Sequence, residues 1–204
     1  AGMHVSSLCK DKAGDIWIGT RQFGVCRYDR KKDDFVFYPY KAPDTMKFVP
    51  AGANTTLSIT CSRNNDSIIY SGTIAGLLEI NKYSGRVNRY YFNNEKDHSY
   101  RHINAFRRIY FHDDGLLYAG TWRAGVNVFN PKDHSLRPLV DPAHGTEELL
   151  LNAVGSVVRK NEHEIWITTS AGLMVYNSAA QQITWRKANQ ILEGVFYGVE
   201  YVDE

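Results

Sequence analysis

The chain has 204 residues, of which 43% are hydrophobic and 23% charged, and its formal net charge is +2. This composition can bury a core and excludes an intrinsically disordered chain. The nearly balanced charge, without a long Lys/Arg run, predicts no nucleic-acid partner. No apolar run reaches the ~18 residues that span a membrane, so we expect membrane attachment only through other parts of a longer parent protein.

A short pattern recurs four times: an apolar run closes on a small residue and Thr, a Gly follows, and a second apolar run ends in Asp or Asn. The copies span residues 15–29, 69–81, 117–130 and 165–177. Their threonines are 53, 48 and 48 residues apart. A period near 50 built from short β-type runs is typical of β-propeller blades. The expected fold is therefore all-β, with four four-stranded antiparallel blades that form a segment of a larger propeller.

The predicted elements follow from this period. Blades are expected at about residues 3–40, 55–92, 102–140 and 150–187, with the first strand of a further blade at 194–202. In the third copy, which serves as the template, strands are predicted at 103–111, 116–120, 126–129 and 136–139. Asp, Asn, Gly and Pro fill the turns between them. The second strand of each copy is almost entirely apolar, which predicts that neighbouring blades cover both of its faces.

Two positions hold the same kind of residue in all four copies. A large aromatic residue stands three positions before each Thr, at Trp17, Tyr70, Tyr118 and Trp166. We interpret these residues as packing between blades rather than as platforms for a ligand. The Gly that follows each Thr is expected to take a positive φ in a turn or bulge. These glycines are Gly24, Gly76, Gly125 and Gly172.

The chain offers little to bind a metal or to catalyse a reaction. Its three cysteines, Cys9, Cys26 and Cys61, cannot all pair within one chain and match no zinc spacing, so we expect buried free thiols on strands. His98 and His102 stand four apart in a polar stretch, where a solvated loop is expected rather than a metal site. No phosphate loop, metalloprotease helix or nucleophile elbow is present, so we expect no catalytic residue, cofactor or metal.

The first copy carries a longer motif. An apolar residue precedes Asp11 and Gly14, then Ile-Trp-Ile-Gly-Thr ends at Thr20, and after Gly24 an apolar run closes on Tyr-Asp at 28–29. This motif resembles the two-component regulator propeller repeat, and the fourth copy keeps most of it. The resemblance implies the periplasmic sensor region of a bacterial hybrid two-component sensor histidine kinase. It also implies an oligosaccharide ligand, a signal passed to a kinase, and no enzymatic activity in this part of the protein.

The first candidate ligand contacts are two adjacent cations. Arg107 and Arg108 lie in a predicted inner strand, where a gap-free overlay with the fourth copy has Gly155 and Ser156. Long cations that replace small residues near the central channel need a partner. An acidic neighbour in the array would serve, and so would an anionic ligand such as a uronic or sulfated sugar.

Two turns supply the remaining candidates. The turns after the first and third Thr each have one extra residue, and they carry Arg21 with Gln22 and Trp122 with Arg123. An aromatic face beside planar hydrogen-bonding groups is a common composition for a sugar site. Ordinary solvation or blade packing would explain the same residues. The long connections between blades are expected on the same rim, because a four-stranded meander returns every second connection to the same end.

Two rival function classes remain open. A propeller lyase-type enzyme would need convergent acid, base or metal groups, and a protein-interaction scaffold would need no small-molecule ligand. We also expect the terminal blades to expose apolar faces through which the protein forms a homo-oligomer. The alternative is a contracted four-blade ring that covers both faces itself.

Overall fold

The structure is a computed structural model that describes residues 4–42, 52–92, 103–140, 153–170 and 172–187. The expected strand at 194–202 lies outside these ranges, as do His98 and His102. Sixteen strands are described. In chain order they are β1 (Val5–Lys10), β2 (Ile16–Thr20), β3 (Gly24–Asp29), β4 (Asp34–Tyr38), β5 (Thr56–Cys61), β6 (Ile68–Thr73), β7 (Gly76–Asn81), β8 (Val87–Tyr90), β9 (Phe106–Phe111), β10 (Leu117–Thr121), β11 (Val126–Asn130), β12 (Ser135–Pro138), β13 (Val154–Arg159), β14 (Glu164–Thr169), β15 (Gly172–Asn177) and β16 (Gln182–Lys187).

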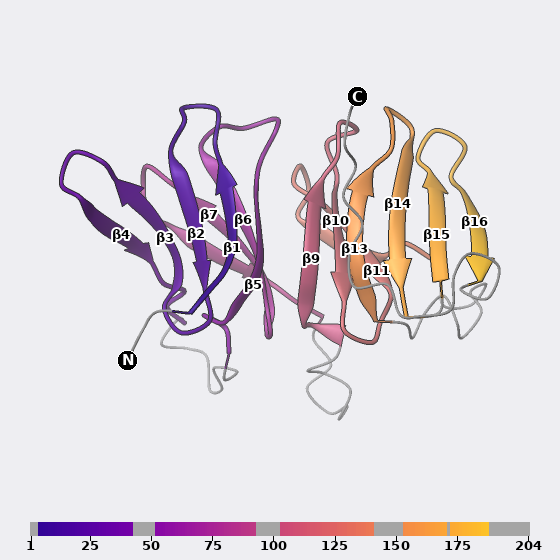
Figure 1. Cartoon of the computed structure of the whole chain (residues 1–204), viewed down its shortest axis with the longest axis horizontal. Coiled ribbons are helices and arrows are strands. Elements are labelled where there is room, and N and C mark those ends of the chain that lie inside the picture. Colours follow the sequence, from indigo (N-terminus) through magenta and orange to yellow (C-terminus); the bar gives the residue numbers. More distant parts are fainter. Residues whose placement is uncertain (1–3, 43–51, 93–102, 141–152, 171, 188–204) are drawn as a thin grey trace.

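The strands form four antiparallel meanders of four consecutive strands each, β1–β4, β5–β8, β9–β12 and β13–β16. We call these sheets 1 to 4. They follow one another in chain order (Figure 1), and their first strands contact one another in the sequence β1, β5, β9, β13. The four-bladed all-β architecture that the repeat predicts is confirmed.

The recurring Thr closes the turn between the second and third strands. The Oγ1 atom of Thr20 donates to the carbonyl of Gly24 and accepts from the amide of Phe23, both at 2.9 Å. The equivalent threonines of the other three sheets donate to the carbonyl of their own Gly in the same way. That Gly has a positive φ in all four sheets, from 58° to 145°, as expected.

The recurring aromatic residue packs each sheet against the next. Trp17 is 0% exposed and shares a core cluster with Ile59 of sheet 2, while Tyr70 and Tyr118 are each 1% exposed against sheets 3 and 4. The packing role is confirmed for these three. Trp166 is only half-buried, because no following sheet covers its side of sheet 4 within the described residues.

The opposite side of sheet 1 is open in the same sense. Leu8 occupies the first-strand position at which Ile59, Ile109 and Val157 pack on the preceding sheet. Those three side chains are 7–8% exposed, whereas Leu8 is 63% exposed. The described sheets therefore form an open arc with an uncovered apolar face at each end.

The first strand of sheet 3 is shorter than predicted. It begins at Phe106 rather than at residue 103. Asn104 instead pairs with Phe92 at the end of sheet 2: its side-chain oxygen accepts from the Phe92 amide at 2.7 Å, and its side-chain nitrogen donates to the Phe92 carbonyl at 3.1 Å. Asn54 brackets Tyr40 between sheets 1 and 2 with the same two bonds. At each of these two connections between sheets, an Asn side chain thus binds both backbone groups of a residue that follows the last strand of the preceding sheet.

The cysteines are not all buried. Cys26 is buried as expected, but Cys9 and Cys61 are half-buried. The expectation fails for these two because they lie on inner strands at the edge of the packing between sheets 1 and 2, beside the core cluster rather than within it.

Candidate functional site

Each inner strand contains a β-bulge at the same point, where its pairing with the second strand shifts by one residue. In β9 the extra residue is Arg107, and in β13 it is Gly155. Arg108 and Ser156 resume the pairing in the two sheets, so the sequence overlay of these positions is correct. A bulge re-aims the side chain that it carries, and in sheet 3 that side chain is a long cation.

Arg107 stacks on Trp122. Its Cζ atom lies 4.1 Å from the centre of the indole ring, a cation–π geometry. The Trp122 side chain is 47% exposed, so the indole keeps accessible surface beyond this contact. The structure therefore brings together two sequence candidates, Arg107 of β9 and Trp122 of the turn after β10, as a single cationic and aromatic unit.

Arg108 stays beside this pair and joins sheet 3 to sheet 4. Its Nε atom donates to the carbonyl of Gly155 and its Nη1 atom to the carbonyl of Arg107, both at 3.0 Å. These acceptors are neutral, and no carboxylate among the described residues forms an ion pair with Arg108. Arg108 therefore brings to the Arg107–Trp122 pair a guanidinium that has carbonyl partners in the described part of the chain.

The two turns that carry the other candidates occupy equivalent places. The amide of Arg21 donates to the carbonyl of His4, and the amide of Trp122 donates to that of Ala105. In Figure 1 β2 and β10 both end at the lower edge of their sheets. The meander places the end of each fourth strand at that same edge. Arg123 is exposed beside Trp122 in the turn of sheet 3.

Arg21 and Gln22 belong to sheet 1, so sheet 2 stands between them and the Arg107–Trp122 pair. Gln22 accepts a weak bond from the His4 amide at 3.4 Å. It also lines a groove of about 250 Å³ together with Phe23 and Phe37, whose exposed rings meet edge to face at 6.2 Å. The candidates thus divide into one group on sheet 3 and another on sheet 1.

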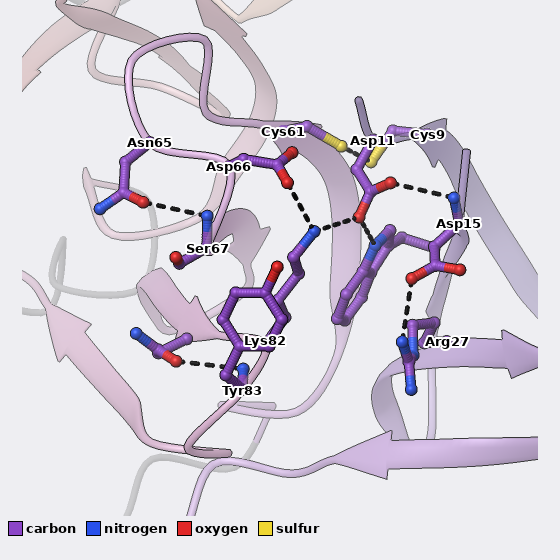
Figure 2. Close-up of polar contacts among 12 residues, drawn as sticks. Cys9, Asp11, Asp15, Arg27, Cys61, Asn65, Asp66, Ser67, Lys82 and Tyr83 are labelled. Carbon is purple, nitrogen blue, oxygen red and sulfur yellow. Dashed lines mark hydrogen bonds and ion pairs between the residues drawn. The ribbon is translucent and has the colours of Figure 1, made fainter. Parts of the chain in front are cut away.

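A buried ion cluster between sheets 1 and 2 is a feature that the sequence reasoning missed. The Lys82 ammonium lies 2.9 Å from Asp11 and 3.0 Å from Asp66 (Figure 2). Asp11 also accepts from the indole nitrogen of Trp17 and the amide of Asp15. The available signal was a Lys after the Asn that ends the third strand, where the third and fourth copies have Pro and Ser.

The charge states of Asp11 and Lys82 indicate that this cluster stabilises the fold rather than taking part in a reaction. Burial would raise the pKa of Asp11, but hydrogen bonds from Lys82 and Trp17 outweigh burial and lower it. Burial would likewise lower the pKa of Lys82, but its two carboxylate partners outweigh burial and raise it. Both groups therefore stay charged at neutral pH. A lysine fixed as a cation is a poor nucleophile or base, so the cluster supplies no acid–base chemistry.

Within the described ranges, no group of three His, Cys, Asp or Glu side chains could hold a metal ion. A helix of the length and hydropathy needed to cross a bilayer does not occur in the part of the chain that the structure describes.

The motif of the first blade also has a counterpart among known families. A family model described as the two component regulator propeller matches residues 1–22. The matched residues contain β1 and β2, so this part of the first blade is similar to that repeat. No curated protein sequence matches the chain.

Several solved structures have a similar fold. Two are extracellular domains of hybrid two component systems from B. thetaiotaomicron. The first has a TM-score of 0.66 and 18% identity over 90% of this chain, and the second has 0.62 and 22% over 85%. This chain spans 24% and 21% of those two domains. Virginiamycin B lyase from Staphylococcus aureus is also similar, with a TM-score of 0.64 and 12% identity over 89% of this chain and 54% of the lyase. Likeness at these identities shows a shared fold.

Proposed function

We propose that this chain is part of the periplasmic ligand-sensing region of a hybrid two-component sensor, where it helps to recognise an oligosaccharide and to signal to a kinase. The regulator propeller repeat at residues 1–22 and the similarity to extracellular domains of hybrid two component systems support this function and an extracytoplasmic location. The exposed turn between β10 and β11 of sheet 3 is held by the sheet and offers a surface on which a ligand could dock.

The observation that carries the ligand class is the guanidinium of Arg107 stacked on the exposed indole of Trp122. An accessible indole face suits the apolar face of a pyranose ring. Arg108 and Arg123 add positive charge beside it, which suits a carboxylate or sulfate on the sugar. We therefore propose an acidic oligosaccharide, containing uronic or sulfated units, as the ligand of this surface.

Titration calorimetry of the sensor region against uronate-containing, sulfated and neutral oligosaccharides tests this function. We expect binding of an acidic member of the set, loss of binding in Trp122→Ala, and weakening by added salt, because screening reduces charge attraction. Lys132→Ala is the matched control: Lys132 is exposed in sheet 3 but lies in the turn at the opposite edge. Binding that is unchanged in Trp122→Ala, or confined to neutral sugars, would contradict the proposed site.

The rival functions have weaker support. The fold likeness to virginiamycin B lyase carries no catalytic group to this chain, and the Asp11–Lys82–Asp66 cluster is held in a charged, bonded state. A protein-interaction scaffold would bind none of the sugars in the calorimetric set. Metal-dependent turnover of a ligand would favour the enzyme.

We further propose that a second copy of this chain docks on the open ends of the arc. The Leu8 face of sheet 1 corresponds to the face by which each later sheet packs on its predecessor. The Trp166 face of sheet 4 corresponds to the face by which each earlier sheet packs on its successor. A head-to-tail contact between two copies would therefore reproduce the interblade packing.

A further inference from the structure

Two cysteines from neighbouring sheets meet at the interblade interface. Cys9 lies on β1 and Cys61 on β5, 52 positions apart in sequence, and their Sγ atoms are 2.7 Å apart. Figure 2 shows the two sulfurs facing each other beside Asp11. In the repeat register the same crossing positions hold Thr60 and Phe111 at the next interface. The paired thiols are therefore particular to the joint between sheets 1 and 2.

The geometry suits a covalent bond. A disulfide has a sulfur–sulfur bond of about 2.05 Å, so closing the 2.7 Å gap needs a movement of well under 1 Å. Both side chains are half-buried, which leaves an approach for a small reagent. Cys26 is 0% exposed, so its thiol is shielded from a reagent and stays out of exchange.

We propose that Cys9 and Cys61 form an interblade disulfide that cross-links sheets 1 and 2, while Cys26 remains a thiol. The oxidant is a disulfide of the thiol–disulfide exchange class. One cysteine attacks that disulfide, forming a mixed disulfide and releasing one reduced thiol; the second cysteine then displaces the other thiol. Two electrons and two protons pass to the oxidant. In the cell the reaction rests on the proposed extracytoplasmic location, where such bonds persist.

The cross-link would add to several polar contacts that already join sheets 1 and 2. The Asp11–Lys82–Asp66 cluster crosses the same interface, and Lys12 donates to the carbonyl of Arg63 at 2.8 Å. The bond would close a loop that contains the whole of sheet 1 after β1 and the first strand of sheet 2. We infer a fixed angle between sheets 1 and 2, whereas the other two joints rely on packing, hydrogen bonds and the ion pairs of Asp113 with Arg63 and Arg159.

The test uses purified protein, first reduced and then treated with oxidised glutathione. In denaturant, the thiol count should fall from three to one, and a digest should yield one peptide pair that joins Cys9 to Cys61. The melting temperature should rise by roughly 8–16 °C if the cross-link acts only on the unfolded chain. Cys26→Ser should leave the cross-link and the shift intact, whereas Cys9→Ser should abolish both.

Three thiols that persist after oxidation, or a bond that involves Cys26 or a second chain, would overturn the proposal. Peptide mapping of the unaltered protein distinguishes these outcomes even if Cys9→Ser fails to fold. Protein isolated directly from cells separates the two hypotheses. A cross-link that forms in vitro but is absent from the isolated protein would leave the interblade bond chemistry supported and count against the extracytoplasmic location.

Discussion

Replacing Lys82 with Met should destabilise the protein by about 3 kcal/mol. The Lys82 and Asp11 side chains are 2% and 1% exposed, and removing one partner of a buried ion pair costs about 3–5 kcal/mol. The lower figure applies because Asp11 keeps two donors, Trp17 and Asp15. Asp66 is 38% exposed, so it regains water and adds little. Met keeps the length of the aliphatic stem, so the loss reports the charge.

Denaturant unfolding under reducing conditions measures this loss without the cross-link. The melting temperature should fall by roughly 6–12 °C. Lys31→Met, at an exposed position, is the control and should stay within about 0.5 kcal/mol of the parent. Adding Asp11→Asn to Lys82→Met should recover part of the loss, because the unpaired charge is then removed. A loss well under 1 kcal/mol for Lys82→Met at neutral pH would refute the reasoning.

The Asp11–Lys82 pair also determines how the free energy of unfolding changes with pH. Because folding lowers the pKa of Asp11 from its ordinary value of 3.8, its contribution is present above that pH and is lost as the pH falls through the folded value. The difference in unfolding free energy between Lys82→Met and the parent should therefore be constant near neutrality and shrink below about pH 4. A difference that grows on acidification would contradict the assignment.

Three further predictions concern packing, binding and assembly. Trp17→Ala should cost about 3–5 kcal/mol of stability by core truncation, and Trp166→Ala should cost less than half as much, because Trp166 is only half-buried; equal losses in denaturant melts would contradict the open arc. Arg123→Ala should weaken acidic-oligosaccharide binding by about 1–3 kcal/mol through loss of charge-assisted bonds, and calorimetric titrations indistinguishable from the parent would remove Arg123 from the site. Leu8→Glu should abolish concentration-dependent association in sedimentation velocity, whereas Tyr83→Glu, on the exposed β7–β8 turn, should not; a parent that stays monomeric at all concentrations would overturn the head-to-tail contact.

Local chemistry made the blades predictable. The Thr–Gly turn is closed by a side chain within a few residues of its partner, so a single-sequence pattern contains the whole interaction. The interblade role of Trp17, Tyr70 and Tyr118 could be predicted because a strand covered on both faces must be apolar throughout. The burial of Trp166 could not, because it depends on which sheet comes next rather than on its own strand.

Contacts between blades were harder to foresee. Cys9 meets Cys61 and Asp11 meets Lys82 across 52 and 71 positions, and no local pattern links either pair. The stacking of Arg107 on Trp122 depends on a β-bulge. The sequence overlay correctly aligned Arg107 with Gly155, but it did not show that a bulge occurs at this position. The sequence therefore supplied the candidates on sheet 3, and the bulge determines which of them touch.

The open arc implies a gradient of local stability along the chain. Sheets 2 and 3 each have two neighbours, whereas sheets 1 and 4 have one each among the described residues. In a linear array the stability of a unit grows with the number of its interfaces, so amide protons of β6 and β10 should exchange most slowly and those of the outer sheets should exchange first. Arg107 and Trp122 thus stand on one of the two most protected sheets. Sheets 1 and 4 can then open locally while Arg107 and Trp122 of sheet 3 stay stacked.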